Sequence, residues 1–357
     1  MRIPDFFIIG APKCGTNALY SYLGGHPHVF MPALKEPQYF CHDFPGLAQV
    51  RNQDDYTRLF EVAPAGAVLG EASVWYLYSE VAVPAIRAAN PATKLIVILR
   101  NPIDAAYSLH TQFLRSLKET EDDFEAAWNL QEPRHHGRRL PRYCPEPRCL
   151  QYRAVCSFGF QVQRLLEWVP PSHLKVLIFE EFFTDIRRGY SGLLEFLGLE
   201  PDERKEFGVA NQNRAARSRT VTRMLGAAMA VLPGDVMAYR RRLKALGIQP
   251  LRLLSRYNTV PASRPPLRPE LRRAVARELT DDVRRLESVL DRSLACWTDF
   301  APASALAPAP SYRQDLVRRL PLRSSRSDPA GGDLISLEDT VSDPKSRVAS
   351  QSRGASQ

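Results

Sequence analysis

The chain has 357 residues, of which 44% are hydrophobic and 24% charged, a balance typical of a globular protein with a sizeable core. Its formal net charge is +9, and 40 of its 48 basic residues are arginines, whose planar guanidinium groups bind phosphate, sulfate and carboxylate in two-point contacts. We therefore expect an anionic ligand. Nucleic acid is not expected as a partner, because the sequence has no zinc-finger, RNP or basic-zipper pattern.

The sequence carries no mark of export, of membrane insertion or of metal binding. We find no signal peptide and no apolar run of membrane-spanning length. The cysteine spacings make no CxxC metal site, although Cys144 and Cys149 could close a small loop. We expect a protein of the reducing cytoplasm that holds no metal and has no integral membrane segment.

The first predicted element is a buried strand at residues 6–9, which a glycine-containing turn joins to a helix. Either Thr16 or Asn17 is expected to cap that helix. A helix N-terminus after such a turn holds an anion with free backbone N–H groups and with the positive end of the helix dipole. Lys13 adds a full charge, and Gly15 lets the backbone approach the ligand.

The glycine spacing in this loop indicates which anion chemistry it serves. Gly10 and Gly15 have the GxxxxG frame of a nucleotide P-loop, but Lys13 precedes the second glycine and Thr16 follows it directly. A P-loop that uses magnesium needs Gly-Lys-Ser or Gly-Lys-Thr at that place. The loop is therefore expected to hold a phosphate without splitting it.

Strands and helices alternate along the rest of the chain, which favours an α/β, P-loop-like three-layer fold with a central parallel sheet flanked by helices. The clearest strand is the continuous apolar run at 94–100, which indicates a central strand covered on both faces. Asn101 and Pro102 then begin a helix, with the asparagine as its cap. Further strands are expected at 29–31 and 174–180, and helices at 51–63, 79–89, 158–169, 190–197, 223–256 and 268–292.

Two stretches are expected to lack regular structure. Residues 120–150 are polar and rich in proline and arginine, which is typical of an irregular insertion that either faces a substrate or is disordered. Residues 303–357 are rich in serine, proline and arginine and cannot bury enough surface to offset their ordering entropy. We therefore predict one domain over residues 1–302 and a disordered tail over 303–357.

A second candidate anion site follows the clearest strand. Arg100 lies at the carboxyl end of that strand, and Ser108 follows inside the predicted helix. In open α/β sheets, ligands bind beyond the carboxyl ends of the strands, where the first loop also lies. Both features should therefore face one crevice, and two separated anion sites fit a ligand that carries phosphate at two positions.

These motifs resemble those of the sulfotransferases that use 3′-phosphoadenosine-5′-phosphosulfate (PAPS). The resemblance rests on the loop from Pro12 to Asn17, on a Lys-Glu-Pro-x-x-Phe box from Lys35 to Phe40, and on the Arg-Asn-Pro motif with Ser108. The box is similar to that of the glycan (heparan sulfate) branch, while the missing membrane anchor points to a soluble, bacterial-type enzyme. The resemblance implies transfer of the sulfuryl group of PAPS to a hydroxyl or amine of an acceptor, such as a carbohydrate or glycolipid, without a metal.

The resemblance also assigns roles to individual residues. Glu36 falls where the glycan enzymes keep their catalytic base, and Lys13 would stabilise the leaving phosphate oxygen. The cofactor-binding candidates are Lys13, Cys14, Gly15, Thr16 and Asn17 for the 5′-phosphosulfate, and Arg100, Ser108, Arg217 and Arg219 for the 3′-phosphate.

One segment departs from the family pattern. The Gly-Glu-x-Ser run at 70–73 is similar to a segment that lines the family's cleft, but Ala72 stands where part of the glycan branch has a lysine. A cation on the acceptor side would then have to come from elsewhere, such as Lys35 or Arg153.

Two other functions remain open from the residues alone. A nucleotide kinase would share the fold, but its magnesium loop and an acidic magnesium ligand after a strand are not found. A non-enzymatic protein that binds polyanions or membrane surfaces would use the basic amphipathic stretch at 239–254.

Overall fold

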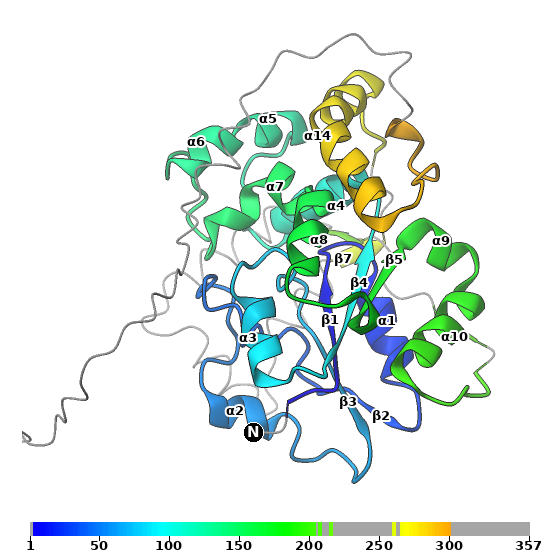
Figure 1. Cartoon of the computed structure of the whole chain (residues 1–357). Coiled ribbons are helices and arrows are strands. Elements are labelled where there is room, and N and C mark those ends of the chain that lie inside the picture. The colour runs from blue at the N-terminus through cyan, green and yellow to red at the C-terminus, as the bar shows by residue number, and fades with distance from the viewer. Residues whose placement is uncertain (1–2, 205, 209–213, 217–258, 262–264, 301–357) are drawn as a thin grey trace, which may run out of the picture. The chain divides into compact units, whose positions relative to one another are not determined.

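The computed structural model describes five ranges of the chain, which are coloured in Figure 1. They are residues 3–204, 206–208, 214–216, 259–261 and 265–300. Several predicted features lie outside the described residues, namely Arg217, Arg219, the helix at 223–256, the stretch at 239–254 and the tail at 303–357.

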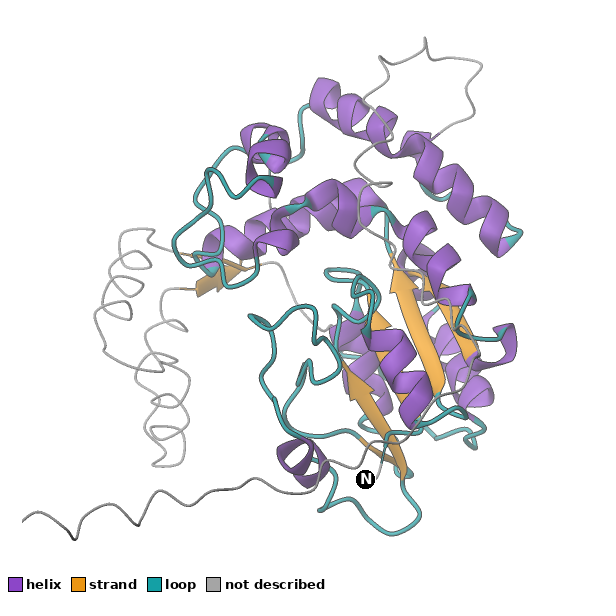
Figure 2. Cartoon of the chain, turned by 60° about the vertical axis from the view of Figure 1, so that its left-hand side comes forward, coloured by secondary structure: helices purple, strands orange, loops and turns teal. Residues whose placement is uncertain are grey.

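The centre of the fold is a parallel sheet, seen in two orientations in Figures 1 and 2. Its five strands are β1 (Phe6–Gly10), β2 (Val29–Phe30), β3 (Val68–Ala72), β4 (Lys94–Leu99) and β5 (Leu174–Ile178). Their order is β2-β3-β1-β4-β5, with every neighbouring pair parallel. Residues 95–99 of β4 are completely buried, which explains the unbroken apolar run, because both faces of the sheet are covered.

The helices are named in chain order. They are α1 (Thr16–Leu23), α2 (Gln53–Arg58), α3 (Ala82–Ala89), α4 (Pro102–Arg115), α5 (Phe124–Asn129), α6 (Gln131–His135), α7 (Tyr152–Cys156), α8 (Phe158–Leu166), α9 (Phe179–Thr184), α10 (Ile186–Leu197) and α14 (Pro269–Leu290). Short 3₁₀ turns are η1 (Pro147–Leu150), η2 (Pro171–His173) and η3 (Thr298–Phe300), and β6 (Arg214–Ala216) pairs antiparallel with β7 (Thr259–Pro261).

Helices cover both faces of the sheet. On one face, Tyr22 of α1 and Tyr190 of α10 both pack against the ring of Phe207. On the other face, α3 and α8 meet, since Val83 and Leu165 line the same hollow. This arrangement follows from right-handed crossovers between parallel strands. The predicted three-layer α/β fold with a central parallel sheet is therefore confirmed.

The predicted insertion at 120–150 is only partly irregular. It contains α5, α6 and η1, and Phe124 and Trp128 of α5 are buried. Arg134 of α6 forms a fully buried, two-point ion pair with Glu119 at 2.7 Å for each contact. These helices were missed because they are too short for hydrophobic periodicity to be visible in the sequence.

Other predicted elements are present with different ends. The helix expected at 51–63 covers only Gln53–Arg58, and the helix expected at 190–197 already begins at Ile186. The strand expected at 174–180 ends at Ile178, where α9 begins. None of the described helices is long and apolar enough to cross a membrane. Cys144 and Cys149 do not pair with each other.

Candidate active site

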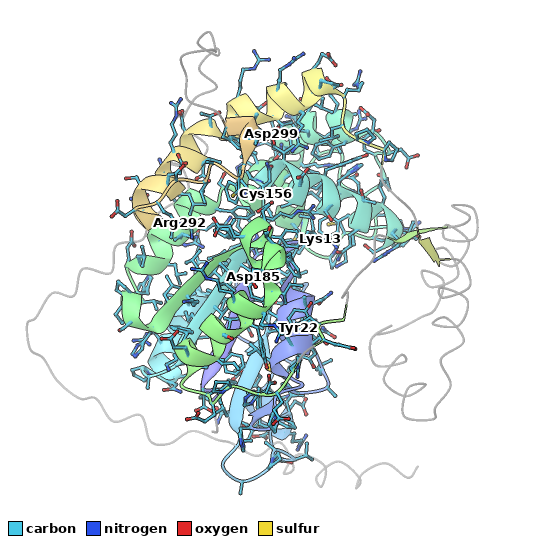
Figure 3. The ribbon with its side chains drawn as sticks, turned by 90° about the vertical axis from the view of Figure 1, so that its right-hand side faces the viewer. Lys13, Tyr22, Cys156, Asp185, Arg292 and Asp299 are labelled. Carbon is cyan, nitrogen blue, oxygen red and sulfur yellow. The ribbon has the colours of Figure 1, made fainter. Side chains whose placement is uncertain are left out.

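The anion loop, residues 10–16, connects β1 to α1 at the carboxyl edge of the sheet. Figure 3 labels Lys13 beside the start of α1. The loop is anchored to the neighbouring strand, because the backbone N–H of Ala11 donates to Ile98 O at 2.9 Å. Cys14 lies inside the loop, and its thiol donates to Pro12 O at 3.4 Å. Burial raises the pKa of Cys14 to about 12, although the nearby Arg100 guanidinium lowers it, so the thiol stays neutral.

Gly15 is the N-cap of α1, and the expectation that Thr16 or Asn17 caps this helix is wrong. Gly15 has φ 101°, and no side chain caps the helix. A Cβ at Gly15 would lie 3.0 Å from the rings of both Phe179 and Phe183. Left-handed backbone and close packing together require glycine here. The N–H of Ala18 donates to Gly15 O at 2.9 Å, and no side chain caps the N–H groups of Thr16 and Asn17, which a ligand can therefore use.

The other predicted contacts in the loop differ in exposure. Lys13 and Gly15 are half-buried, Asn17 is exposed and Thr16 is buried. The backbone N–H of Cys14 already donates to Ala11 O at 3.3 Å. The side chain of Cys14 therefore supports the loop from inside, whereas Lys13 and Asn17 are placed where a ligand can reach them.

Arg100 lies directly after β4, next to the anion loop. Its guanidinium stacks over the ring of Phe179 at 4.7 Å, and that ring also packs against Gly15. The Nε atom of Arg100 is buried without a hydrogen-bond partner, and no described carboxylate forms an ion pair with this arginine. A buried arginine donor without an anion is typical of a site that binds one. Ser108 is buried within α4, 7% exposed.

Sequence reasoning missed the residues that hold the turn after Arg100. Glu180 accepts the backbone N–H of Asn101 at 3.0 Å and the indole N–H of Trp297 at 2.8 Å. Asp299, labelled in Figure 3, accepts the Asn101 side chain at 2.8 Å and both ends of the Arg272 guanidinium at 2.6 Å. These partners lie far along the chain from Asn101, so no local pattern could have identified them.

Glu36 lies beside the end of β3, in the Glu36 turn, residues 35–40. The backbone N–H of Glu36 donates to Ala72 O at 3.0 Å. Its carboxylate pairs with Lys35 at 3.0 Å and its side chain is 33% exposed, so it remains accessible. Lys35 therefore provides a cation beside the candidate base. Arg153, the other cation considered, pairs instead with Glu278 of α14.

The expectation that the segment at 70–73 lines the cleft is wrong. Glu71 and Ser73 are completely buried, so their side chains do not line a cleft as the family resemblance implied. The candidate site is built instead on the ends of three adjacent strands. The order β3-β1-β4 places Glu36, the anion loop and Arg100 in sequence along one edge of the sheet.

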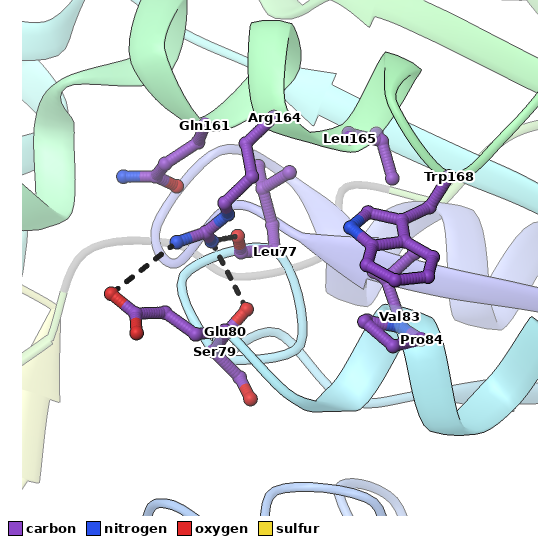
Figure 4. A pocket seen from close by; sticks show the side chains of 9 residues that line it. All are labelled: Leu77, Ser79, Glu80, Val83, Pro84, Gln161, Arg164, Leu165 and Trp168. Atoms are coloured by element: carbon purple, nitrogen blue, oxygen red, sulfur yellow. Dashed lines mark hydrogen bonds and ion pairs between the residues drawn. The ribbon is translucent and has the colours of Figure 1, made fainter. Parts of the chain in front are cut away.

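A hollow on the α3–α8 face is separate from these residues, and Figure 4 shows its lining. Arg164 lines it and donates to three consecutive carbonyl oxygens, those of residues 77–79, at 2.7–3.1 Å. None of the candidate site residues lines this hollow. Within the described ranges, no group of three His, Cys, Asp or Glu side chains could hold a metal ion.

A parallel α/β sheet with a glycine anion loop at its carboxyl edge defines a class of phosphate-binding proteins. Within that class, a family model for the sulfotransferase domain matches residues 3–213, and the chain belongs to this family.

Relatives of known name and structure share this domain. The chain is 27% identical to mouse carbohydrate sulfotransferase 15 in an alignment of length 267, which covers 61% of this chain and 47% of the relative. It is 31% identical over 210 residues to human bifunctional heparan sulfate N-deacetylase/N-sulfotransferase 3, covering 56% of this chain and 23% of the relative. The chain thus spans about half or less of these relatives. A sulfotransferase structure from Alicyclobacillus acidocaldarius has a TM-score of 0.61 and 27% identity, covering 84% of this chain and 100% of that one.

Proposed function

We propose that this protein is a sulfotransferase that moves the sulfuryl group of PAPS to a hydroxyl or amine of a carbohydrate acceptor. One observation carries the proposal. Glu36, the anion loop with Lys13, and Arg100 stand at the ends of three adjacent parallel strands in a chain of the sulfotransferase family. This order along one edge of the sheet fits the PAPS donor. The anion loop would hold the reacting phosphosulfate, the carboxylate would face the acceptor on one side, and the arginine would face the 3′-phosphate on the other.

Residues of the chain would hold the two ends of the donor separately. The anion loop offers helix N–H groups and the Lys13 ammonium to the 5′-phosphosulfate. Arg100, with its unpartnered Nε, would take the 3′-phosphate in a two-point contact. The contributions of Ser108, Arg217 and Arg219 to the same phosphate remain predictions.

Glu36 would act as the general base of the transfer. It would take the acceptor proton while the acceptor oxygen bonds to sulfur and the bond from sulfur to the bridging oxygen breaks. Lys13 would stabilise the electron pair that remains on the phosphate oxygen, an electrostatic role. The products are the sulfated acceptor and adenosine 3′,5′-bisphosphate. A positioned base contributes a factor of about 10²–10⁴ in rate.

A carbohydrate acceptor is supported by the Lys-Glu-Pro-x-x-Phe box and by the names of the curated relatives. The kinase alternative is disfavoured, because Lys13 precedes Gly15 and the loop lacks the magnesium-binding order. The surface-binding alternative depends on residues 239–254, which lie outside the described residues. A location in the cytoplasm stays a prediction.

The test is a thermal-shift titration followed by a transfer assay. We expect adenosine 3′,5′-bisphosphate to raise the melting temperature without magnesium, and labelled PAPS to transfer sulfate to members of a panel of carbohydrates and small alcohols. Stabilisation by ATP with magnesium alone would favour a kinase instead. Stabilisation by neither nucleotide, together with binding to anionic liposomes, would favour the surface-binding protein.

A further inference from the structure

The Glu36 turn has a backbone conformation that residues other than glycine rarely adopt. Glu36 has φ 60° and Gln38 has φ 54°, both in the left-handed region. Residues held in this region persist only where the surrounding structure fixes them, and they concentrate at functional sites. The turn that carries the candidate base therefore needs external support.

That support comes from the segment that follows β3. The N–H of Glu36 donates to Ala72 O, as described above. The N–H of Gln38 donates to the Ser73 hydroxyl oxygen at 3.1 Å, and the N–H of Phe40 donates to the Tyr76 hydroxyl oxygen at 3.3 Å. Two hydroxyl groups thus act as acceptors for the turn.

A buried carboxyl group lies behind these two hydroxyls. Glu71 is 0% exposed, and its Oε2 accepts hydrogen bonds from Tyr56 at 2.8 Å and from Tyr76 at 3.2 Å. Its Oε1 has no hydrogen-bond partner, and no described Lys, Arg or His pairs with it. The titratable groups that face it are Tyr56 of α2, Tyr76, and the Cys41 thiol of the loop after the turn, with Tyr39 stacked on Tyr56.

The charge state of this carboxyl decides how the hydroxyls point. An ionised carboxylate only accepts, so Tyr76 gives it a hydrogen and keeps its oxygen lone pair for the N–H of Phe40. Ser73, whose hydroxyl stabilises the ionised form of Glu71, can likewise turn its hydrogen toward the carboxylate and keep accepting from Gln38. A protonated carboxyl also donates, and a hydroxyl oxygen of this network that accepts its hydrogen must turn its own hydrogen away from the carboxyl. Protonation therefore reorients the hydroxyls that hold the turn and makes their oxygens share a second donor with the N–H groups of Gln38 and Phe40.

We propose that ionised Glu71 is a positioning residue that orients the Tyr76 and Ser73 hydroxyls and thereby holds Glu36 in its left-handed conformation. The proposal rests on the proposed function of Glu36 as the base. Burial raises the pKa of Glu71 to about 7, against the opposing effect of the hydroxyls of Ser73, Tyr56 and Tyr76. Turnover should therefore depend on an ionisation near neutral pH that belongs to a group which never touches substrate.

The experiment compares Glu71→Gln, Tyr76→Phe and Tyr56→Phe with the unaltered full chain. We expect Glu71→Gln to lower kcat about 10-fold while the KM for PAPS and the affinity for adenosine 3′,5′-bisphosphate change less than about twofold. The kcat of the unaltered chain should increase as the pH is raised through about 7. The Glu71→Gln variant should not show this increase. Tyr56→Phe is the matched control, because the Tyr56 hydroxyl donates to Glu71 but accepts no N–H of the turn, and the variant keeps the ring that packs on Tyr39 and Phe40. It should lower kcat less than Tyr76→Phe does.

The outcomes separate this inference from the proposed function. A Glu71→Gln variant with unaltered kcat and an unaltered pH profile would overturn the inference, even if Glu36→Gln abolishes turnover. A fully active Glu36→Gln variant would instead remove Glu36 as the base. If Glu71→Gln does not fold, Tyr76→Phe decides, since an unchanged kcat in that variant also overturns the inference.

Discussion

The anion loop and the Glu36 turn lie at the ends of adjacent strands and both contain left-handed backbone, but different contacts hold it. In the anion loop, Gly15 at φ 101° carries no Cβ strain, and Lys13 at φ 66° lies between backbone hydrogen bonds from Ala11 to Ile98 and from Cys14 to Ala11. In the Glu36 turn, Glu36 and Gln38 have left-handed backbone, and their N–H groups donate to Ala72 O and to the Ser73 hydroxyl oxygen, which lie outside the turn. The donor side is therefore set by local backbone, and the base side by distant side chains. Changes on the donor side should therefore alter binding, and changes on the base side should alter turnover.

Glu36→Gln should have the largest effect. The amide cannot take the acceptor proton, so kcat should fall by a factor of about 10²–10⁴ with donor affinity unchanged. Steady-state sulfate transfer and a binding titration with adenosine 3′,5′-bisphosphate measure the two quantities. Glu61→Gln, an exposed carboxylate away from the turn, is the control. If donor affinity falls by the same factor as kcat, the Glu36 turn does not act on turnover alone, and the division between the two regions is wrong.

Glu71→Gln should make the protein more stable while it becomes less active. The pKa of Glu71 is raised in the folded state, so its protonated form stabilises the fold below about pH 4.5, and this contribution is lost as the pH rises through about 7. At pH 8, the buried charge costs up to about 3 kcal/mol, which the neutral amide avoids.

Urea unfolding at pH 8 and at pH 4.5 measures this difference. The gain in the free energy of unfolding should appear at pH 8 and disappear at pH 4.5. A variant that is less stable at pH 8 would show that the amide's unpaired N–H₂ group outweighs the removed charge.

Arg100→Ala should act on binding alone. Loss of a charged two-point contact corresponds to about 1.5–3 kcal/mol, or roughly a 10- to 100-fold weaker affinity for adenosine 3′,5′-bisphosphate. Calorimetric titration checks this, with the exposed Arg51→Ala as the control for general charge. The second anion site is discarded if affinity does not change, or if adenosine 5′-phosphate weakens by the same factor.

Gly15→Ala should have the smallest effect of the four. Left-handed strain costs about 1–2 kcal/mol, and the new Cβ would also press on Phe179 and Phe183. We expect a lower melting temperature and weaker binding of the bisphosphate. Gly66→Ala separates these causes, because Gly66 has φ 77° but no atoms within 4 Å of a new Cβ. Equal loss of binding in both variants would argue against a specific role for the loop.

The sequence predicted the fold well, together with the positions of the anion loop and Arg100 at the edge of the sheet, because these depend on local patterns. The apolar run of β4, the glycine spacing of the anion loop and the position of Arg100 are all visible in short windows. The Glu71 network is not visible in this way, since Tyr56 and Tyr76 meet Glu71 only after the sheet has formed. The same holds for Glu180 and Asp299, whose contacts to Asn101 join distant segments.

The bonds to Asn101 also decide how far the domain may be shortened. The family match ends at residue 213, but Arg272, Trp297 and Asp299 all lie beyond it and brace the turn after Arg100. A protein truncated at residue 213 would keep the anion loop, the Lys-Glu-Pro box and Arg100, but it would lose the residues that hold the turn after Arg100. A working fragment must therefore extend past Asp299.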